Sequence, residues 1–203
     1  MNYLAHLYLA DCTGTSLAGS LLGDVVRGPL QGRFSAELER GIHLHRRIDS
    51  FTDRHPRVLA AKARLQAPYR RYAGILLDVY FDHCLAQSWD RWHRQSLEDF
   101  ASEAYRQLLR ESLTLAHPGF SLRLAYMRSR NLLLSYRNQA GIERALEGLA
   151  GRLSRANPLA TGLDALLPHE AELHADFQAF FPELLNFARQ TADDTRAPDP
   201  GHS

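Results

Sequence analysis

Apolar residues recur at intervals of three and four along most of this chain, and alternation of period two is hard to find over a useful length. The first spacing places side chains on one face of a helix, whereas period two is typical of a strand. The pattern therefore predicts an all-α protein, with helices over residues 2–10, 15–27, 35–54, 57–66, 69–88, 97–116, 121–137, 140–154 and 163–190.

Several predicted boundaries have a chemical cause. Ser35 is a residue type that caps helix N-termini, and Pro56 and Pro68 stand near helix starts, where a missing amide hydrogen is harmless. Pro118 breaks the apolar pattern after the sixth predicted helix. Pro182 lies inside the last one and predicts a kink or a break there.

The chain has no internal repeat and no linker rich in Gly, Ser or Pro, so we expect one compact domain over residues 1–190. With 203 residues, 45% of them hydrophobic, it is long enough to bury one sizeable core. Residues 191–203 have no aliphatic side chain larger than alanine to bury, which predicts a disordered tail.

Charge is nearly balanced, with 24 Lys and Arg against 23 Asp and Glu. A protein that coats nucleic acid carries a strong positive field, so this class is excluded and no nucleic-acid partner is expected. Lys62 is the only lysine. The guanidinium group suits phosphate, but we give more weight to a codon bias of the source genome as the cause.

Cys12 and Cys84 are the only cysteines, too few for a disulfide framework or a zinc knuckle. The apolar residues 1–10 lack a basic leader and are interrupted by His6, unlike a signal peptide. No run reaches the roughly 20 apolar residues of a membrane span. We therefore expect a cytoplasmic protein with no membrane partner.

Asp24 shares a predicted helix face with Leu17 and Leu21. A carboxylate beside the core is costly unless it is paired or bound to a metal. An ion pair with Arg27, three residues later, explains Asp24 about as well as a metal does.

His45 and Asp49 stand four residues apart and form one helical stripe with Thr52, next to an apolar stripe that includes Leu44 and Ile48. Imidazole nitrogen and carboxylate oxygen together suit a divalent transition metal. The spacing therefore predicts that His45 and Asp49 present two metal ligands in one direction at the border of the core.

Asp78 and Asp82 are also four residues apart, in a segment that is apolar nearly all round. Two buried like charges repel unless a shared cation neutralises them. The alternative is that each pairs with an arginine, such as Arg71, and we favour the metal. Spacing alone favours a structural role for His6, but it joins Asp24, His45, Asp49, Asp78 and Asp82 as a candidate ligand for one or two metals.

The motifs that carry a resemblance are residues 1–10, 21–28, 41–49, 51–53 and 77–83. On these motifs the chain closely resembles the acyl carrier protein phosphodiesterase family, also called holo-acyl-carrier-protein hydrolases, over nearly its whole length. Several long motifs in the right order are far more specific than one short pattern.

The resemblance implies hydrolysis of the phosphodiester that joins 4′-phosphopantetheine to a serine of acyl carrier protein, within lipid metabolism. It also implies a divalent cation, with Mn²⁺ favoured over Mg²⁺ or another ion, and a divergent relative of the all-helical HD-domain phosphohydrolases. The sequence departs from the HD pattern because it contains no adjacent His-Asp pair; Asp82-His83 runs the other way.

Three residues are assigned to catalysis by hypothesis. Arg27 or Arg46 stabilises charge that develops on the phosphate, and His83 protonates the serine oxygen as it leaves. The carrier protein is strongly acidic in this family context, so a basic rim is expected, with Arg47, Arg54 and Arg57 as partner-binding residues.

Two other functions stay open. One is a metal-dependent phosphohydrolase that acts on a nucleotide or another small phosphodiester with the same ligands. The other is an inactive helical module that binds an acidic partner through its arginines.

Overall fold

The computed structural model describes residues 1–195, and within this range it contains helices and no strand, which confirms the predicted all-α class. The α-helices are α1 (Tyr3–Thr13), α2 (Leu17–Gly23), α3 (Ala36–Arg54), α4 (Pro56–Arg64), α5 (Ala73–Gln87), α6 (Leu97–Ser112), α7 (Pro118–Ser129), α8 (Leu132–Ser135), α9 (Gln139–Ala150), α10 (Gly162–Leu166) and α11 (Glu170–Asp194). Short 3₁₀ turns are η1 (Arg70–Tyr72), η2 (Trp89–Arg91), η3 (Leu159–Thr161) and η4 (Leu167–His169).

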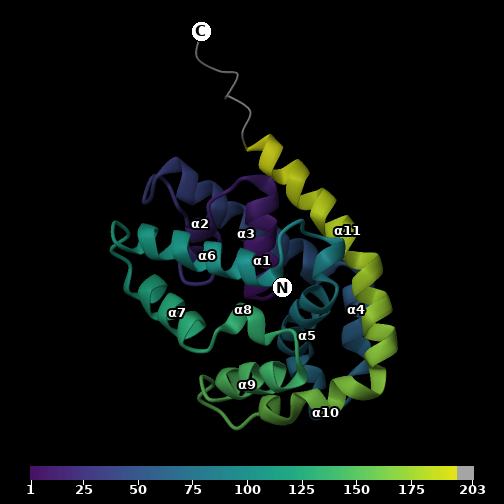
Figure 1. The fold of residues 1–203 in the computed structure, drawn as a ribbon. Helices are drawn as coiled ribbons and strands as arrows, with labels where there is room; N and C mark the ends of the chain where they lie inside the picture. Colours follow the sequence, from purple (N-terminus) through teal and green to yellow (C-terminus); the bar gives the residue numbers. More distant parts are fainter. Residues whose placement is uncertain (196–203) are drawn as a thin grey trace.

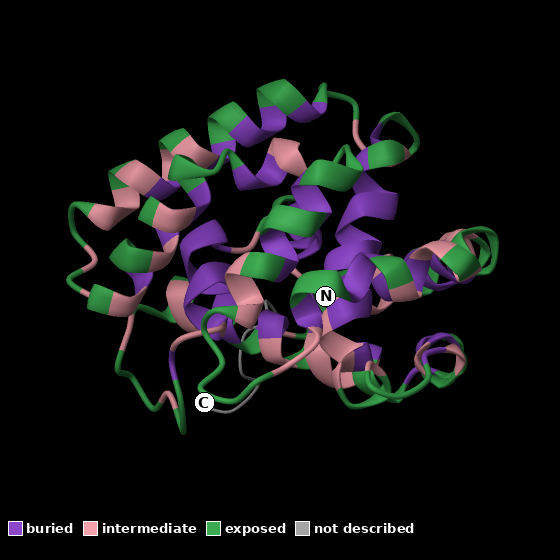
Figure 2. Ribbon diagram, turned by 90° about the horizontal axis from the view of Figure 1, so that it is seen from below, coloured by how far each residue is buried: buried purple, intermediate pink, exposed green. Residues whose placement is uncertain are grey.

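Helices α1 and α5 form the centre of the molecule because their sequences are apolar nearly all round, and most residues of both are buried. Figure 1 shows the N-terminus in the middle of the fold beside α1 and α5, while α11 arches along one edge and α9 and α10 close one end. The buried ribbon in Figure 2 lies mainly in this interior, and the outer helices turn exposed faces to water.

Helices α2 and α3 pack against each other at very short range, because each carries a glycine at the crossing. A Cβ atom on Gly19 would lie 2.9 Å from the Gly41 Cα and 2.6 Å from the Leu38 carbonyl oxygen. No larger residue fits there without moving a helix. This crossing sets the position of α3 relative to the end of α2.

Two of the chemical signals at helix starts, Ser35 and Pro56, are confirmed, whereas Pro68 lies two residues before η1 and five before α5. The Ser35 side chain accepts a hydrogen bond from the Leu38 amide at 3.4 Å, and α4 and α7 begin at Pro56 and Pro118. These ends depend on residues close in sequence, and sequence patterns predict such ends well.

Two predicted helices end earlier than expected. Helix α2 ends at Gly23 instead of residue 27. Two β-branched valines follow, and Gly28 has a left-handed φ of 76°, which is incompatible with a continuing helix. The predicted helix 121–137 is divided into α7 and α8 by Asn131, which has a φ of 43°. Asparagine tolerates this left-handed conformation better than most residues.

The last predicted helix is also divided, since α10 and η4 precede α11. Helix α11 continues through Pro182, which is exposed, so water can replace the hydrogen bond that proline cannot donate. It also continues to Asp194 with Thr191 and Ala192 buried, so the predicted tail is helical over its first four residues. The part of that tail beyond residue 195 lies outside the described residues.

Between residues 1 and 195 no helix is both long enough and apolar enough to cross a bilayer. Cys12 and Cys84 are both free thiols.

Candidate metal centre

The candidate site is centred on His6 of α1 and on His45 and Asp49 of α3. One ligand atom from each of these three residues lies within 4.8 Å of the others. The Asp49 carboxylate accepts hydrogen bonds from His6 Nε2 at 3.0 Å and from His45 Nε2 at 3.2 Å. The two imidazole rings are buried and stacked, with centroids 3.8 Å apart. Two nitrogens and a carboxylate oxygen converge here as a divalent metal requires.

Helix α2 lies close to α3, and the missing side chain at Gly23 of α2 leaves room for the His45 ring. A Cβ atom on Gly23 would lie 2.3 Å from Cγ of the His45 ring, so the imidazole occupies the space that any other side chain would fill. The helical spacing of His45 and Asp49 predicted that they face one direction. The structure places His6, the candidate ligand that spacing supported least, in the same group.

Asp24 caps the end of α2 and joins the edge of the group. Its Oδ1 atom lies 3.7 Å from His45 Nε2, and its Oδ2 atom accepts from Arg123 Nη1 of α7 at 3.0 Å. Arg123 Nη1 also donates to the Tyr3 hydroxyl at 2.5 Å. Arg27 was one of two explanations offered for Asp24, and the ion pair that the structure shows is instead with Arg123.

Arg123 is a site residue that the sequence analysis missed. It lies 99 residues from Asp24 in the sequence. Its helix, α7, has no unusual sequence pattern and no aspartate or glutamate to pair with it. No local signal in the sequence distinguishes Arg123 from the other arginines.

Asp78 reaches the margin of the group through the chain start. The Met1 amino group lies 2.9 Å from Asp78 Oδ1 and 3.8 Å from Asp49 Oδ1. The Met1 amino group is therefore the cation that lies between the carboxylates of Asp78 on α5 and Asp49 on α3. This cation is not an arginine side chain. Asp78 stays a predicted metal ligand that is adjacent to the group of three.

Asp82 has a different role from the predicted one. Its two oxygens accept hydrogen bonds from the Leu4 amide at 2.7 Å and the Ala5 amide at 3.1 Å, so it caps the N-terminus of α1. Burial raises the pKa of Asp82 to about 7, although these amides favour the ionised form. These bonds show that Asp82 anchors α1, and its binding to a metal stays a prediction.

Two of the three candidate ligands, His6 and Asp49, are held in metal-binding forms near neutral pH. Burial lowers the pKa of His6 to about 4, and the neighbouring His45 ring lowers it further. Burial alone would raise the pKa of Asp49, but hydrogen bonds from His45 and His6 outweigh it and hold this pKa well below its usual range. Neutral imidazole and ionised carboxylate are the forms that bind a metal.

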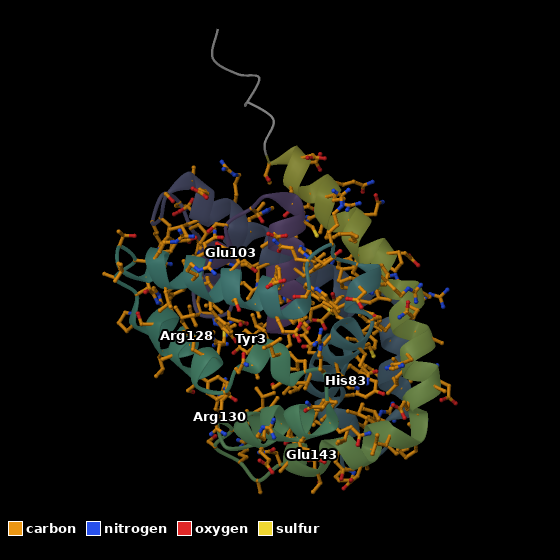
Figure 3. The ribbon with its side chains drawn as sticks, in the orientation of Figure 1. Tyr3, His83, Glu103, Arg128, Arg130 and Glu143 are labelled. Carbon is orange, nitrogen blue, oxygen red and sulfur yellow. The ribbon has the colours of Figure 1, made fainter. Side chains whose placement is uncertain are left out.

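His83 points to another part of the core. Its Nδ1 atom donates to the Tyr136 carbonyl at 2.6 Å, and its ring lies near Tyr80 and His174. Figure 3 shows His83 well apart from Tyr3, on the side of the molecule toward α11. Its described contacts are with Tyr136 directly after α8, with α11 and with its own helix, so the role of His83 as proton donor stays a prediction that these contacts do not support.

Two of the predicted arginines line an open hollow of about 280 Å³ over the ligand group. Arg27 and Arg46 share this hollow with His45 and Asp49, and Arg46 Nη2 donates to the Val26 carbonyl at 2.9 Å. That bond fixes the guanidinium at the rim. The hollow therefore combines the candidate metal ligands with positive charge, which suits a phosphate group.

The predicted partner-binding arginines lie on a different flank of α3. Arg47 and Arg54 line a hollow of about 320 Å³ together with Phe51, His55 and Phe187, and also with Ser50 and Pro56. The Arg47 guanidinium lies 5.6 Å from the centre of the Phe187 ring. Arg57 is the second residue of α4 and lies nearby, with its Nε atom 4.0 Å from Glu183 Oε1. Two residues along a helix turn a side chain by about 200°, so Arg47 points away from the metal ligands on α3.

Comparison with known proteins gives a consistent family. The model of the family described as acyl carrier protein phosphodiesterase matches residues 1–184. A protein of that name from Yersinia enterocolitica is 39% identical over 190 residues, which cover 93% of this chain and 98% of the relative. Namesakes from Photorhabdus laumondii and Escherichia coli O157:H7 are each 36% identical, over 93% and 95% of this chain and 95% and 100% of their own lengths. No solved structure matches the chain.

Proposed function

The chain belongs to the acyl carrier protein phosphodiesterase family, and on this premise we propose that it hydrolyses the phosphodiester between 4′-phosphopantetheine and a serine of acyl carrier protein. The products are the apo carrier protein and free 4′-phosphopantetheine. One observation supports this reaction: His6, His45 and Asp49 converge beneath a hollow lined by arginine.

His6, His45 and Asp49, with Asp24 beside them, would hold a divalent metal, with Mn²⁺ favoured. Such an ion would supply Lewis-acid activation of a water molecule and of the phosphoryl oxygens. The donor set fits such an ion, since two buried imidazoles and an ionised carboxylate face one point. The relation to HD-domain enzymes remains a prediction.

The protein's own residues position the phosphate. Arg46 is held at the rim by its bond to the Val26 carbonyl, and Arg27 stands exposed on the same rim, so both can meet phosphoryl oxygens. Arg123 binds Asp24 and thereby fixes the carboxylate that borders His45. An acidic carrier protein is attracted to Arg47, Arg54 and Arg57 on the neighbouring flank.

We place the reaction in the cytoplasm, since Cys12 and Cys84 are both free, the state that a reducing compartment maintains.

The deciding experiment uses holo acyl carrier protein, Mn²⁺ and intact-protein mass measurement. The wild-type chain should remove the mass of 4′-phosphopantetheine, and His45→Ala and Asp49→Asn should not. Asp53→Asn is the matched control, because Asp53 lies one turn further along α3, exposed and paired with Lys62. Turnover of nucleotides with no loss of phosphopantetheine would replace this function by the small-phosphodiester alternative.

Partner binding in the absence of metal and turnover would favour the inactive module instead. Metal analysis separates the two: the enzyme should bind Mn²⁺ in the wild type and lose it in His45→Ala. If His45→Ala and Asp49→Asn both kept full turnover, the proposed centre would be refuted.

A further inference from the structure

A second hollow lies on the other side of Asp24, against α7. It measures about 470 Å³, and Val25, Gly119, Leu122, Arg123, Tyr126 and Arg152 line it. Its walls are mainly apolar, and Leu122 exposes 75% of its surface to water. An apolar hollow of this size that stays open is typical of a site for part of a ligand.

Two residues of this hollow adjoin the candidate metal centre. Val25 directly follows Asp24, and Arg123 both lines the hollow and binds Asp24 at 3.0 Å. Tyr3, which Arg123 also contacts, borders a small cavity together with His6 and His45. In Figure 3 the Tyr3 side chain lies in the centre of the molecule, near the α7 side. A ligand in this hollow would therefore end beside the metal ligands.

The hollow also offers hydrogen-bond donors and no acid. Its charged lining residues are Arg123 and Arg152 alone. The Nε atom of Arg123 is buried without a hydrogen-bond partner, so this guanidinium retains an unused donor. The Arg152 guanidinium stacks 4.3 Å over the Tyr126 ring, which presents it along the edge of the apolar surface.

We propose that this α7 hollow binds the pantetheine arm of the substrate. The inference rests on the proposed function and names where that substrate's prosthetic group lies. The arm carries methyl and methylene groups, which suit Val25, Leu122 and Tyr126, and amide carbonyls, which accept from arginine. The phosphate end then lies at the ligand group beside Arg27 and Arg46, and the carrier protein stays outside that hollow, toward Arg47, Arg54 and Arg57.

Pantetheine without its phosphate is the test ligand, because it cannot bind through a metal or a phosphate site. Binding to the full chain is measured by saturation-transfer NMR, without reference to catalysis. Leu122→Glu places a carboxylate on the apolar wall and should weaken pantetheine binding at least about tenfold. Leu59→Glu is the matched control, since Leu59 is an exposed leucine of α4, away from the hollow, and should leave binding unchanged.

Three outcomes would overturn the proposal: no binding of pantetheine to the wild type, equal loss in both variants, or binding of octanoate but not of pantetheine. Circular dichroism checks that both variants fold, which their exposed positions favour. Phosphopantetheine release from holo carrier protein is assayed separately. Pantetheine binding without release of phosphopantetheine would refute the proposed reaction and leave the proposed binding site standing. Release of phosphopantetheine without pantetheine binding would refute the binding site and leave the reaction standing.

Discussion

Replacing Gly23 with alanine should displace the His45 imidazole and leave most of the fold in place. The added Cβ would lie 2.3 Å from His45 Cγ, 2.5 Å from Cδ2 and 2.7 Å from Cβ. Ordinary carbon contacts begin at 3.4 Å, so the ring must retreat by about 1 Å. It has little room to do so, because it is buried and stacks on His6 with centroids 3.8 Å apart.

The expected magnitudes follow from that displacement. Overpacking costs about 1–3 kcal/mol of unfolding free energy, partly offset by up to about 1 kcal/mol of helix propensity. A ligand moved by about 1 Å costs roughly a hundredfold in turnover. We also expect Mn²⁺ affinity to fall by at least about tenfold, since metal sites require their ligands in place.

Three measurements test this expectation: Mn²⁺ titration by calorimetry, release of phosphopantetheine by intact-protein mass, and urea unfolding. Gly74→Ala in α5 is the matched control, because its Cβ would meet nothing closer than the Lys62 side chain at 3.6 Å. That variant should keep affinity and turnover and match or exceed wild-type stability. A Gly23→Ala protein with wild-type metal affinity and turnover would show that His45 is not a ligand.

Further expectations concern pH, charge and the long-range ion pair. The pKa of Asp82 is raised to about 7 in the folded protein from 3.8, so Asp82 stabilises the folded state at low pH, and this contribution is lost as pH rises from about 4 through 7. Asp82→Asn should flatten this pH dependence of the unfolding free energy. Urea denaturation at a series of pH values measures it. Arg54→Glu should raise KM for holo carrier protein several-fold at low salt and little at high salt, whereas Arg144→Glu, exposed on α9, should not. Arg123→Ala should lower turnover about ten- to a hundredfold, because Asp24 loses its partner, while Arg128→Ala at the end of the same helix should leave turnover unchanged.

The sequence predicted the part of the site that lies on one helix. His45 and Asp49 are four residues apart in α3, and helical geometry alone brings their side chains together. Charged rim residues on the same segment, such as Arg46, were predicted for the same reason. The helix starts at Ser35 and Pro56 were predictable for the same reason, because a capping side chain and the amide it binds are only a few residues apart in the sequence.

Long-range contacts decided the rest. Asp82 and Asp78 have the same spacing as His45 and Asp49, yet Asp82 binds the amides that begin α1, 77 and 78 residues away. A periodic pattern shows which residues share a face and does not show what that face meets. The same limit applies to His83, since the partner of its Nδ1 atom is the Tyr136 carbonyl, 53 residues later.

The sequence by itself therefore determined that the chain is helical, which residues share a helix face, and, through the order of its motifs, the family it resembles. Tertiary structure decided which faces meet: α1 brings His6 to α3, and α7 brings Arg123 to Asp24. The physical reason is range. Helix periodicity and caps act over a few residues, whereas burial, hydrogen bonds and ion pairs between helices depend on packing, and here close packing required Gly19, Gly23 and Gly41.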